Sequence, residues 1–386
     1  MSASEAAVSD RIETFRWTPA HVAAIGDGAG GGAGAAAPLI AAAPAPVLPG
    51  IDIWDHWPIV DRAGRTVAFA GGPLVVALTA PVLPDPDDRH AIARLRLMQA
   101  GADGWRDFGY LLPDTLNPGS REWAGNTILE EDGRTLSFYY TSAGVRGEAR
   151  PSFVQRLLLT RGTLSFAGGA AHASDWSAPE EIVVPDDVLY QRDMEGGGAV
   201  GAIKAFRDPF PIVDPVTGVE HVLFTASRAG SASAWNGVIG IARRDAAGWT
   251  LLPPLVDADG VNNELERPHV VRHDGRLYLF WSTQAKVFAD GGPRGPTGLY
   301  GVVAEELYGP WRPLNGTGLV LANPAEAPFQ AYSWLVLDDL SVWSFADLVG
   351  VATPPDDVAA TRAAFAGTPA PVVRLTLDGD RTAVVG

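Results

Sequence analysis

An aspartate stands between two tryptophans near residue 55, and a charged side chain is unexpected there. Asp55 lies between Trp54 and Trp57, ahead of the apolar run Pro58–Val60. A carboxylate among indole rings is costly to remove from water unless it is paired or takes part in chemistry. Polar or acidic residues recur beside or close to an aromatic residue or a proline further along the chain, at Glu122, Arg207, Asp208, Glu264, Glu266 and Tyr332.

Carboxylates combined with indole faces have the composition of a sugar-binding site. Sugar rings stack on indoles, and their hydroxyls need fixed hydrogen-bond acceptors. Cleavage of a glycosidic bond needs two carboxyl groups, one ionised and one protonated. Burial and mutual repulsion in a crowded acidic pocket can separate the pKa values of such a pair. Each acid taken singly could be a turn, cap or surface residue, but their matching placement along the chain favours the site.

Five hairpin-like units would position these residues. They begin near residues 54, 122, 206, 266 and 332, and each has a short apolar run, a turn and a second strand rich in Phe, Tyr or Trp. Two of the turns are Asp-Gly, the strongest short hairpin signal. The pattern predicts an all-β fold, a single five-bladed β-propeller rather than five hairpins of a sandwich. The first strand of each blade would line the central channel, so the leading residues would meet in a funnel-shaped active site.

Composition limits the possible partners. The 386 residues carry a formal net charge of −16, which argues against nucleic acid or an anionic membrane. The absence of cysteine excludes disulfides, thiolate catalysis and cysteine–zinc sites. No apolar run approaches the roughly 18 residues of a membrane span. The N-terminus lacks the basic and apolar regions of a standard signal peptide, so the sequence leaves open whether the protein is cytoplasmic or exported.

The expected domain organisation is one catalytic propeller with two extensions. We expect an N-terminal extension over 1–49 packed on the propeller, the propeller itself over 50–350, and a C-terminal extension over 351–386. The last of these should end in a hairpin around Asp378–Gly379, because Asp-Gly again marks a tight turn.

Five motifs in order along the chain resemble those of glycoside hydrolase family 68, the levansucrase and β-fructofuranosidase group. They are WDHWP, EWAG, FRDPF, ELERP and AYSW, and the resemblance runs from about Trp17 to about Ala346. It implies a five-bladed propeller, in agreement with the repeat. It also implies a sucrose-cleaving enzyme that works with retention through a covalent fructosyl-enzyme, needs no cofactor, and has sucrose and fructosyl acceptors as partners.

The resemblance assigns a role to each motif residue. Asp55 would be the nucleophile, Asp208 the stabiliser that holds the fructosyl hydroxyls, and Glu266 the general acid/base. The remaining residues would bind or enclose the substrate: Arg207 and Glu264 at sugar hydroxyls, Trp54 and Trp123 as walls of the pocket, and Tyr332 as support for the acid/base.

Three departures from the family pattern carry predictions. Ala124 stands where most members have a serine bonded to the nucleophile, which should raise the pKa of Asp55 modestly unless Asn126 substitutes. Gln284 stands where polymer-forming members have Arg or His, which favours hydrolysis or short oligosaccharides over long levan. Calcium-binding members have acids where this chain has Ala202 and Asn263, so no metal site is predicted.

Two other functions remain open from the sequence. An arabinan-cleaving enzyme would share the five-bladed fold and three carboxylates, but should lack the ordered motifs. A catalytically weak sugar-binding propeller is slightly favoured by Ala124, while the retained Asp55, Asp208 and Glu266 argue against it. Incubation with sucrose separates these functions by the sugars that are released.

Overall fold

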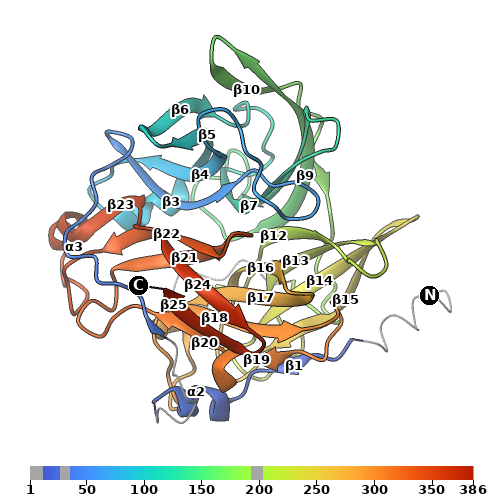
Figure 1. The fold of residues 1–386 in the computed structure, drawn as a ribbon, viewed down its shortest axis with the longest axis vertical. Coiled ribbons are helices and arrows are strands. Elements are labelled where there is room, and N and C mark those ends of the chain that lie inside the picture. Colours follow the sequence, from blue (N-terminus) through green and yellow to red (C-terminus); the bar gives the residue numbers. More distant parts are fainter. Residues whose placement is uncertain (1–11, 27–34, 193–202, 386) are drawn as a thin grey trace.

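Five sheets follow one another along the chain and form the blades of a β-propeller (Figure 1). The computed structural model describes residues 12–26, 35–192 and 203–385. In Figure 1 the blades run round the molecule in sequence order, from blue through green and yellow to red, and the last blade lies beside the first. The inner strands of successive blades contact one another round the ring. The predicted all-β, five-bladed fold is confirmed.

The first two blades have four principal strands each. The first contains β3 (Ile51–Pro58), β4 (Leu74–Pro81), β5 (Arg94–Gly101) and β6 (Gly104–Tyr110). The second contains β7 (Arg121–Leu129), β8 (Thr135–Ala143), β9 (Gln155–Ala167) and β10 (Ala170–Ser174), with the short β11 (Glu180–Glu181) paired to β9.

The third and fourth blades each gain an outer strand from the N-terminal segment. The third contains β12 (Phe206–Val213), β13 (Glu220–Ser227), β14 (Gly237–Asp245), β15 (Gly248–Asp257) and the parallel β1 (Phe15–Arg16). The fourth contains β16 (Glu266–His273), β17 (Arg276–Thr283), β18 (Gly298–Ala304), β19 (Arg312–Pro313), β20 (Leu319–Ala322) and the parallel β2 (Ala35–Ala36). The N-terminal segment therefore lies along the outer edges of two blades.

The fifth blade extends to the end of the described chain. It contains β21 (Ala331–Val336), β22 (Ser341–Leu348), β23 (Phe365–Pro369), β24 (Val373–Asp378) and β25 (Arg381–Val385). The hairpin β24–β25 turns at Gly379–Asp380, one residue beyond the expected position, and β24 pairs with β22. The expected boundary at residue 350 therefore differs from the structure, because residues beyond it supply strands to this blade.

Helices are short and lie outside the sheets. They are α2 (Pro19–Gly26), α3 (Val358–Ala364) and three 3-10 turns, η1 (Pro86–Ala91), η2 (Ala285–Val287) and η3 (Leu314–Gly316). Among the described residues, no helix is long and apolar enough to cross a membrane.

The hairpin expected at the start of the first blade differs from the structure in the position of its second strand. The sequence placed that strand directly after Ala63–Gly64, but β4 begins only at Leu74. Asp61 accepts hydrogen bonds from the backbone N–H groups of Ala63 and Arg65. This local turn reverses the chain, but the two arms of the turn form only one isolated antiparallel β-bridge and no strand pair. An Asx-type turn therefore lies where the sequence predicted a hairpin. The hairpins of the other four units form as expected.

A buried ion pair joins the last blade to the first. Arg362 of α3 makes two hydrogen bonds to the Asp52 carboxylate on β3, from Nη1 to Oδ2 at 2.6 Å and from Nη2 to Oδ1 at 3.2 Å. The Asp52 side chain is 3% exposed and that of Arg362 is 21% exposed. The ring of blades is thus closed by a bidentate contact between segments 310 residues apart.

Candidate active site

A β-bulge interrupts the inner strand of every blade at a corresponding place. The register shifts after Ile53, Trp123, Arg207, Glu266 and Tyr332. A bulge leaves residues unpaired, bends the strand and redirects their side chains. The bulged residues are Trp54 and Asp55, Ala124, Asp208 and Pro209, Arg267 and Pro268, and Ser333 and Trp334. All the predicted site residues except Glu264 and Gln284 therefore lie in or next to these five matching bulges.

Arg207 connects the acids of the third and fourth blades. Its Nη2 lies 2.9 Å from Oε1 of Glu266 and 3.5 Å from Oε2 of Glu264, and its Nε lies 3.8 Å from Oδ2 of Asp208. The Arg207 side chain is only 8% exposed. One buried guanidinium thus contacts three of the predicted carboxylates.

Asp208 has the least exposed side chain of these three acids. Its Oδ2 accepts hydrogen bonds from the Thr225 hydroxyl at 2.9 Å and from the backbone N–H of Arg267 at 3.1 Å. Burial raises the pKa of Asp208 to about 6, although the positive charge of Arg207 opposes the rise. Asp208 also has a positive φ of 60°, a conformation that non-glycine residues keep only when their surroundings hold it.

Asp55 is surrounded by groups from the fourth and fifth blades. Its carboxylate lies near the side chain of Ser333 and close enough to Arg267 to feel its charge. Arg267 donates from Nη1 to the Ser333 hydroxyl at 2.8 Å and from Nη2 to the backbone carbonyl of His56 at 3.1 Å. Burial raises the pKa of Asp55, and Arg267 and Ser333 oppose that rise.

Glu266 is oriented from two sides and is more exposed than Asp208 and Glu264. Arg207 holds Oε1, and the Tyr332 hydroxyl donates to Oε2. The side chain of Gln284 lies near the hydroxyl of Tyr332 and lowers its pKa, while burial and Glu266 raise it. The Glu266 side chain is 19% exposed, against 8% for Asp208. The structure therefore places Gln284 and Tyr332 beside Glu266, which is more exposed than Asp208.

Glu264 lies beside this pair on the segment that leads into β16. Its backbone N–H donates to Oδ1 of Asn262 at 2.8 Å, and its Oε1 accepts from Asn263 at 3.4 Å. Burial raises the pKa of Glu264, and the charge of Arg207 opposes the rise. A carboxyl in this setting can accept or donate a hydrogen bond to a sugar hydroxyl.

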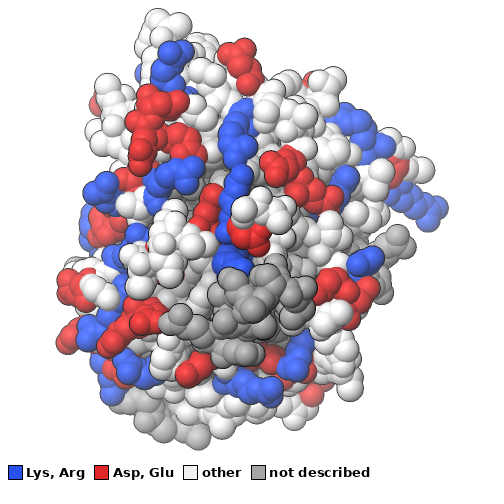
Figure 2. Space-filling model, turned by 90° about the vertical axis from the view of Figure 1, so that its right-hand side faces the viewer, with Lys and Arg blue, Asp and Glu red and all other residues white. Residues whose placement is uncertain are grey.

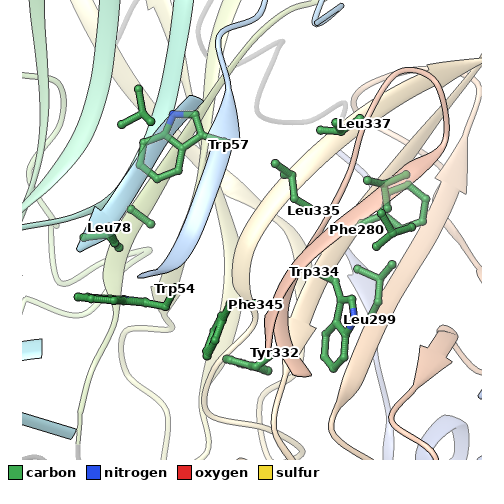
Figure 3. Close-up of a cluster of buried hydrophobic side chains, with 14 of the residues drawn as sticks. Trp54, Trp57, Leu78, Phe280, Leu299, Tyr332, Trp334, Leu335, Leu337 and Phe345 are labelled. Atoms are coloured by element: carbon green, nitrogen blue, oxygen red, sulfur yellow. The ribbon is translucent and has the colours of Figure 1, made fainter. Parts of the chain in front are cut away.

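Aromatic side chains form the apolar side of the site. Figure 3 shows Trp54 of β3 and Tyr332 of β21 at one end of a buried cluster, with Phe345 between them, while Trp57 lies further along its strand. The indole N–H of Trp123 donates to the carbonyl of His90 at 3.2 Å, which ties the second blade to the loop of the first. Both tryptophans are therefore fixed by packing or by a hydrogen bond.

Ala124 leaves the second bulge without a hydroxyl. Its side chain is buried in the same cluster as Trp54. Asn126, which the sequence offered as a replacement, is buried with its Oδ1 unpaired among the described residues. The hydroxyl that lies near Asp55 and lowers its pKa belongs instead to Ser333 of the fifth blade.

Sequence reasoning missed three cations around the site. The first, Arg267, lies within a quoted motif but was given no role, and the same is true of the neutral Ser333. The second, Arg89, was not noticed. Arg89 is buried, its guanidinium lies 5.5 Å from the ring centre of Trp54, and its charge lowers the pKa of Asp55. The third cation, Lys204, donates from Nζ to Oδ1 of Asn263 at 3.0 Å. Arg89 and Lys204 have no local sequence signal beyond their own charge.

The predicted absence of a metal rests on Ala202, which lies outside the described residues, and on Asn263. Lys204 Nζ also donates to the carbonyl of Ala234 at 2.5 Å and to Oδ1 of Asn236 at 2.8 Å. An ammonium group therefore occupies a set of oxygen ligands beside Asn263. Among the described residues, no group of three or more His, Asp or Glu side chains is arranged to hold a metal ion.

The surface carries mixed charge in spite of the net charge of −16. Acidic and basic side chains are interspersed over the face drawn in Figure 2. Such a surface differs from the continuous basic patch that binds nucleic acid.

Comparisons with known proteins agree with this geometry. The family model described as levansucrase/invertase matches residues 8–236 and 227–386. A levansucrase of Pseudomonas savastanoi pv. glycinea is 33% identical over 90% of this chain and 86% of its own length. An extracellular sucrase of Zymomonas mobilis is 32% identical over 86% of this chain and 84% of its own length.

Solved structures extend the agreement to the fold. An inulosucrase from Halalkalicoccus jeotgali, bound to kestose, superposes with a TM-score of 0.86 and 36% identity, covering 97% of this chain and 96% of that one. A levansucrase from Gluconacetobacter diazotrophicus gives a TM-score of 0.80 and 25% identity, covering 97% and 90%. The chain therefore belongs to the levansucrase/invertase family, glycoside hydrolase family 68, and is a glycoside hydrolase or fructosyltransferase.

Proposed function

We propose that this enzyme cleaves sucrose by a retaining double displacement, with Asp55 as nucleophile, Glu266 as general acid/base and Asp208 as stabiliser of the fructosyl ring. The observation that carries the proposal is the different environment of the three acids. Asp55 lies near Ser333 and Arg267, which lower its pKa, Asp208 is buried under two hydrogen bonds, and Glu266 is more exposed than Asp208. Different environments are what allow carboxyls in one pocket to take different roles.

In the first step, Asp55 attacks the anomeric carbon of the fructosyl unit. The bond to the glucosyl oxygen breaks while Glu266 gives that oxygen its proton, and glucose leaves. The product is a fructosyl ester of Asp55. Because Glu266 is more exposed than Asp208, it suits the side of the pocket from which the leaving group departs.

In the second step, Glu266 acts as a base. It takes a proton from water or from a sugar hydroxyl, whose oxygen attacks the anomeric carbon and releases Asp55. Two displacements at one carbon give overall retention. Asp208 would bind fructosyl hydroxyls throughout, and its negative charge would stabilise the positive charge that develops on the ring.

We infer that hydrolysis and short oligosaccharides prevail over long levan. Gln284 is neutral and reaches the hydroxyl of Tyr332, so the outer part of the site has an amide where a cation would hold a longer acceptor. The relatives support fructosyl chemistry rather than arabinan cleavage, since they are named levansucrase, inulosucrase and sucrase.

Incubation with sucrose, with glucose and fructose quantified separately, tests the proposal. Equal release of the two sugars indicates hydrolysis, and glucose in excess over fructose indicates transfer. We expect release close to equal at low sucrose and a moderate excess of glucose at high sucrose. Release of neither sugar by the folded protein would contradict the proposal and favour the sugar-binding alternative.

The role of Gln284 is tested by Gln284→Arg, with Gln284→Asn as the neutral control. The arginine variant should raise the ratio of transfer to hydrolysis and lengthen the products, while the asparagine variant should not. An unchanged product distribution in Gln284→Arg would remove this residue from the explanation.

A further inference from the structure

Two buried histidines occupy equivalent places in the first and fourth blades. His56 and His269 are each the first residue of an inner strand to pair again after the bulge. Gly125, Phe210 and Leu335 stand at this place in the second, third and fifth blades. A histidine therefore follows the bulge only in the two blades that carry the proposed nucleophile and the proposed acid/base.

Each of these histidines donates a hydrogen bond back to the first residue of its bulge. His56 donates from Nδ1 to the carbonyl of Trp54 at 2.8 Å, and His269 donates from Nδ1 to the carbonyl of Arg267 at 2.9 Å. A carbonyl can only accept, so Nδ1 carries the proton in both rings. Residues in a bulge lose ladder partners, and their backbone groups need others. The two rings supply such partners to the two bulges.

The second ring nitrogen of His269 reaches the fifth blade. Its Nε2 accepts a hydrogen bond from the backbone N–H of Val336 at 2.9 Å, so Nε2 has no proton and the ring is neutral. His269 is 1% exposed and His56 is 3% exposed. Burial lowers the pKa of His269 to about 3 and that of His56 to about 4. Both rings therefore keep the neutral form that these contacts require.

Arg267 joins the contacts of the two histidines. Its carbonyl accepts from His269, and its Nη2 donates to the carbonyl of His56 at 3.1 Å. Asp55 stands between Trp54 and His56, so the carbonyl on each side of it accepts a hydrogen bond. Arg267 also has a positive φ of 51°, which a non-glycine residue keeps only when its surroundings hold it. One network thus runs from the fifth blade through the fourth to the backbone on both sides of Asp55.

We propose that His56 and His269 are positioning residues of the reaction. Through their Nδ1–H groups they hold the bulges that direct the carboxylates of Asp55 and Glu266 to one anomeric carbon. They act through the backbone and not at the reacting atoms. This inference rests on the proposed roles of Asp55 and Glu266.

The first test is the protonation of the two rings in the wild-type protein. Nitrogen-15 spectra of protein labelled at histidine, with His56→Asn and His269→Asn to assign the rings, report which nitrogen carries the proton. Both rings should be neutral near pH 6, with the proton on Nδ1. A charged ring, or a proton on Nε2 of either ring, would remove the contacts and overturn the inference.

The second test compares asparagine with phenylalanine at each position. Asparagine has an amide N–H where the ring has Nδ1, whereas phenylalanine keeps an aromatic ring without a donor. His56→Phe and His269→Phe should each lose about 10–100-fold in kcat on sucrose, because a shift of about 1 Å at the reacting groups can cost about 10²-fold. The asparagine variants should retain severalfold more of kcat. Rates are taken per folded protein, and leucine replaces phenylalanine where that variant does not fold.

His221→Phe is the matched control. His221 of β13 is also buried and donates from Nδ1 to the carbonyl of Val219, two residues back, at 3.0 Å, but it lies outside the inner strands. Its replacement should lower the melting temperature and leave kcat within about twofold. A merely structural role for His56 and His269 predicts the same behaviour there, with equal kcat in the folded asparagine and phenylalanine variants.

Hydrogen exchange separates this inference from the proposed function, because it requires no activity. The backbone amides of residues 51–58 should exchange faster in His56→Phe than in the wild type and in His56→Asn. If the wild type fails to cleave sucrose but this difference is present, the proposed function fails and the role of His56 in holding the bulge stands. Equal exchange in the three proteins, or equal kcat in the asparagine and phenylalanine variants, overturns the inference.

Discussion

Arg207 donates a 2.9 Å hydrogen bond from Nη2 to Oε1 of Glu266, so a buried cation on the third blade orients the proposed acid/base on the fourth. The Tyr332 hydroxyl, from the fifth blade, donates to the other oxygen of the same carboxylate. Three blades therefore place one proton-transfer group. Asp208 is less exposed, at 8% against 19% for Glu266, and its Oδ2 accepts hydrogen bonds from Thr225 and from the backbone N–H of Arg267.

This arrangement predicts that the acids differ in their response to the leaving group. Glu266→Ala should lose about 10²–10⁴-fold on sucrose but recover much of the first step on a fructoside whose leaving group needs no proton. Asp208→Ala should fail with both substrates, since it acts on the fructosyl ring. Initial rates of the two variants on the two substrates make the comparison. Leaving-group dependence in Asp208→Ala, with none in Glu266→Ala, would mean that the two roles are reversed.

The pH dependence should show an acid limb near the pKa of Asp208. Burial raises that pKa to about 6, so the carboxyl takes up a proton as the pH falls through this value. Because the proposed stabiliser must be negatively charged, kcat/KM of the free enzyme should fall as the pH drops below about 6. A profile measured from pH 4 to 8 with sucrose well below KM tests this. Activity that stays constant down to pH 4 would contradict it.

The contact that closes the ring should matter for stability. Arg362→Met leaves the buried Asp52 carboxylate without its partner, and breaking a buried pair in this way costs about 3 kcal/mol. Arg374→Met is the control, because the Arg374–Asp339 pair is exposed and should contribute less than about 1 kcal/mol. Urea unfolding of both variants gives the comparison. Equal, small losses would show that Asp52 and Arg362 do not hold the first and last blades together.

We expect the ammonium group of Lys204 to occupy the position at which calcium-binding members would hold a metal ion. Its ammonium bonds to three oxygens, from Ala234, Asn236 and Asn263, and the last of these precedes Glu264. Lys204→Met should therefore lose about 2 kcal/mol, while Lys286→Met, at an exposed lysine, should not. The wild-type melting temperature should be the same with excess chelator and with added calcium. A fall in the melting temperature on chelation would contradict the predicted absence of a metal site.

The inner strands and their acids could be predicted from sequence because the residues and turns of each unit are neighbours in the chain. The roles of Arg267 and Ser333 could not, although both lie within quoted motifs. Their side chains are directed by bulges, and a bulge depends on how two strands pair. Lys204 and Asn263 are partners 59 residues apart, with no local pattern that joins them.

The C-terminal boundary was missed for a related reason. The residues of β24 alternate between buried and exposed, which is also the pattern of a separate hairpin on the surface. Only the pairing of Arg374 and Val373 with β22 shows that the strand belongs to the fifth blade. Sequence periodicity predicts a strand but not the strand beside which it lies.

The central claim is that Asp55 forms a covalent bond to the fructosyl unit. It is tested most directly by mixing Glu266→Ala with an activated fructoside, quenching in acid and mapping peptides by mass spectrometry. Without its base the variant should release the ester slowly, so a fructosyl unit should accumulate on the peptide that contains Asp55, at that residue. Asp55→Ala should show no adduct. Turnover without an adduct and with inversion at the anomeric carbon, or an adduct on another residue, would contradict the account.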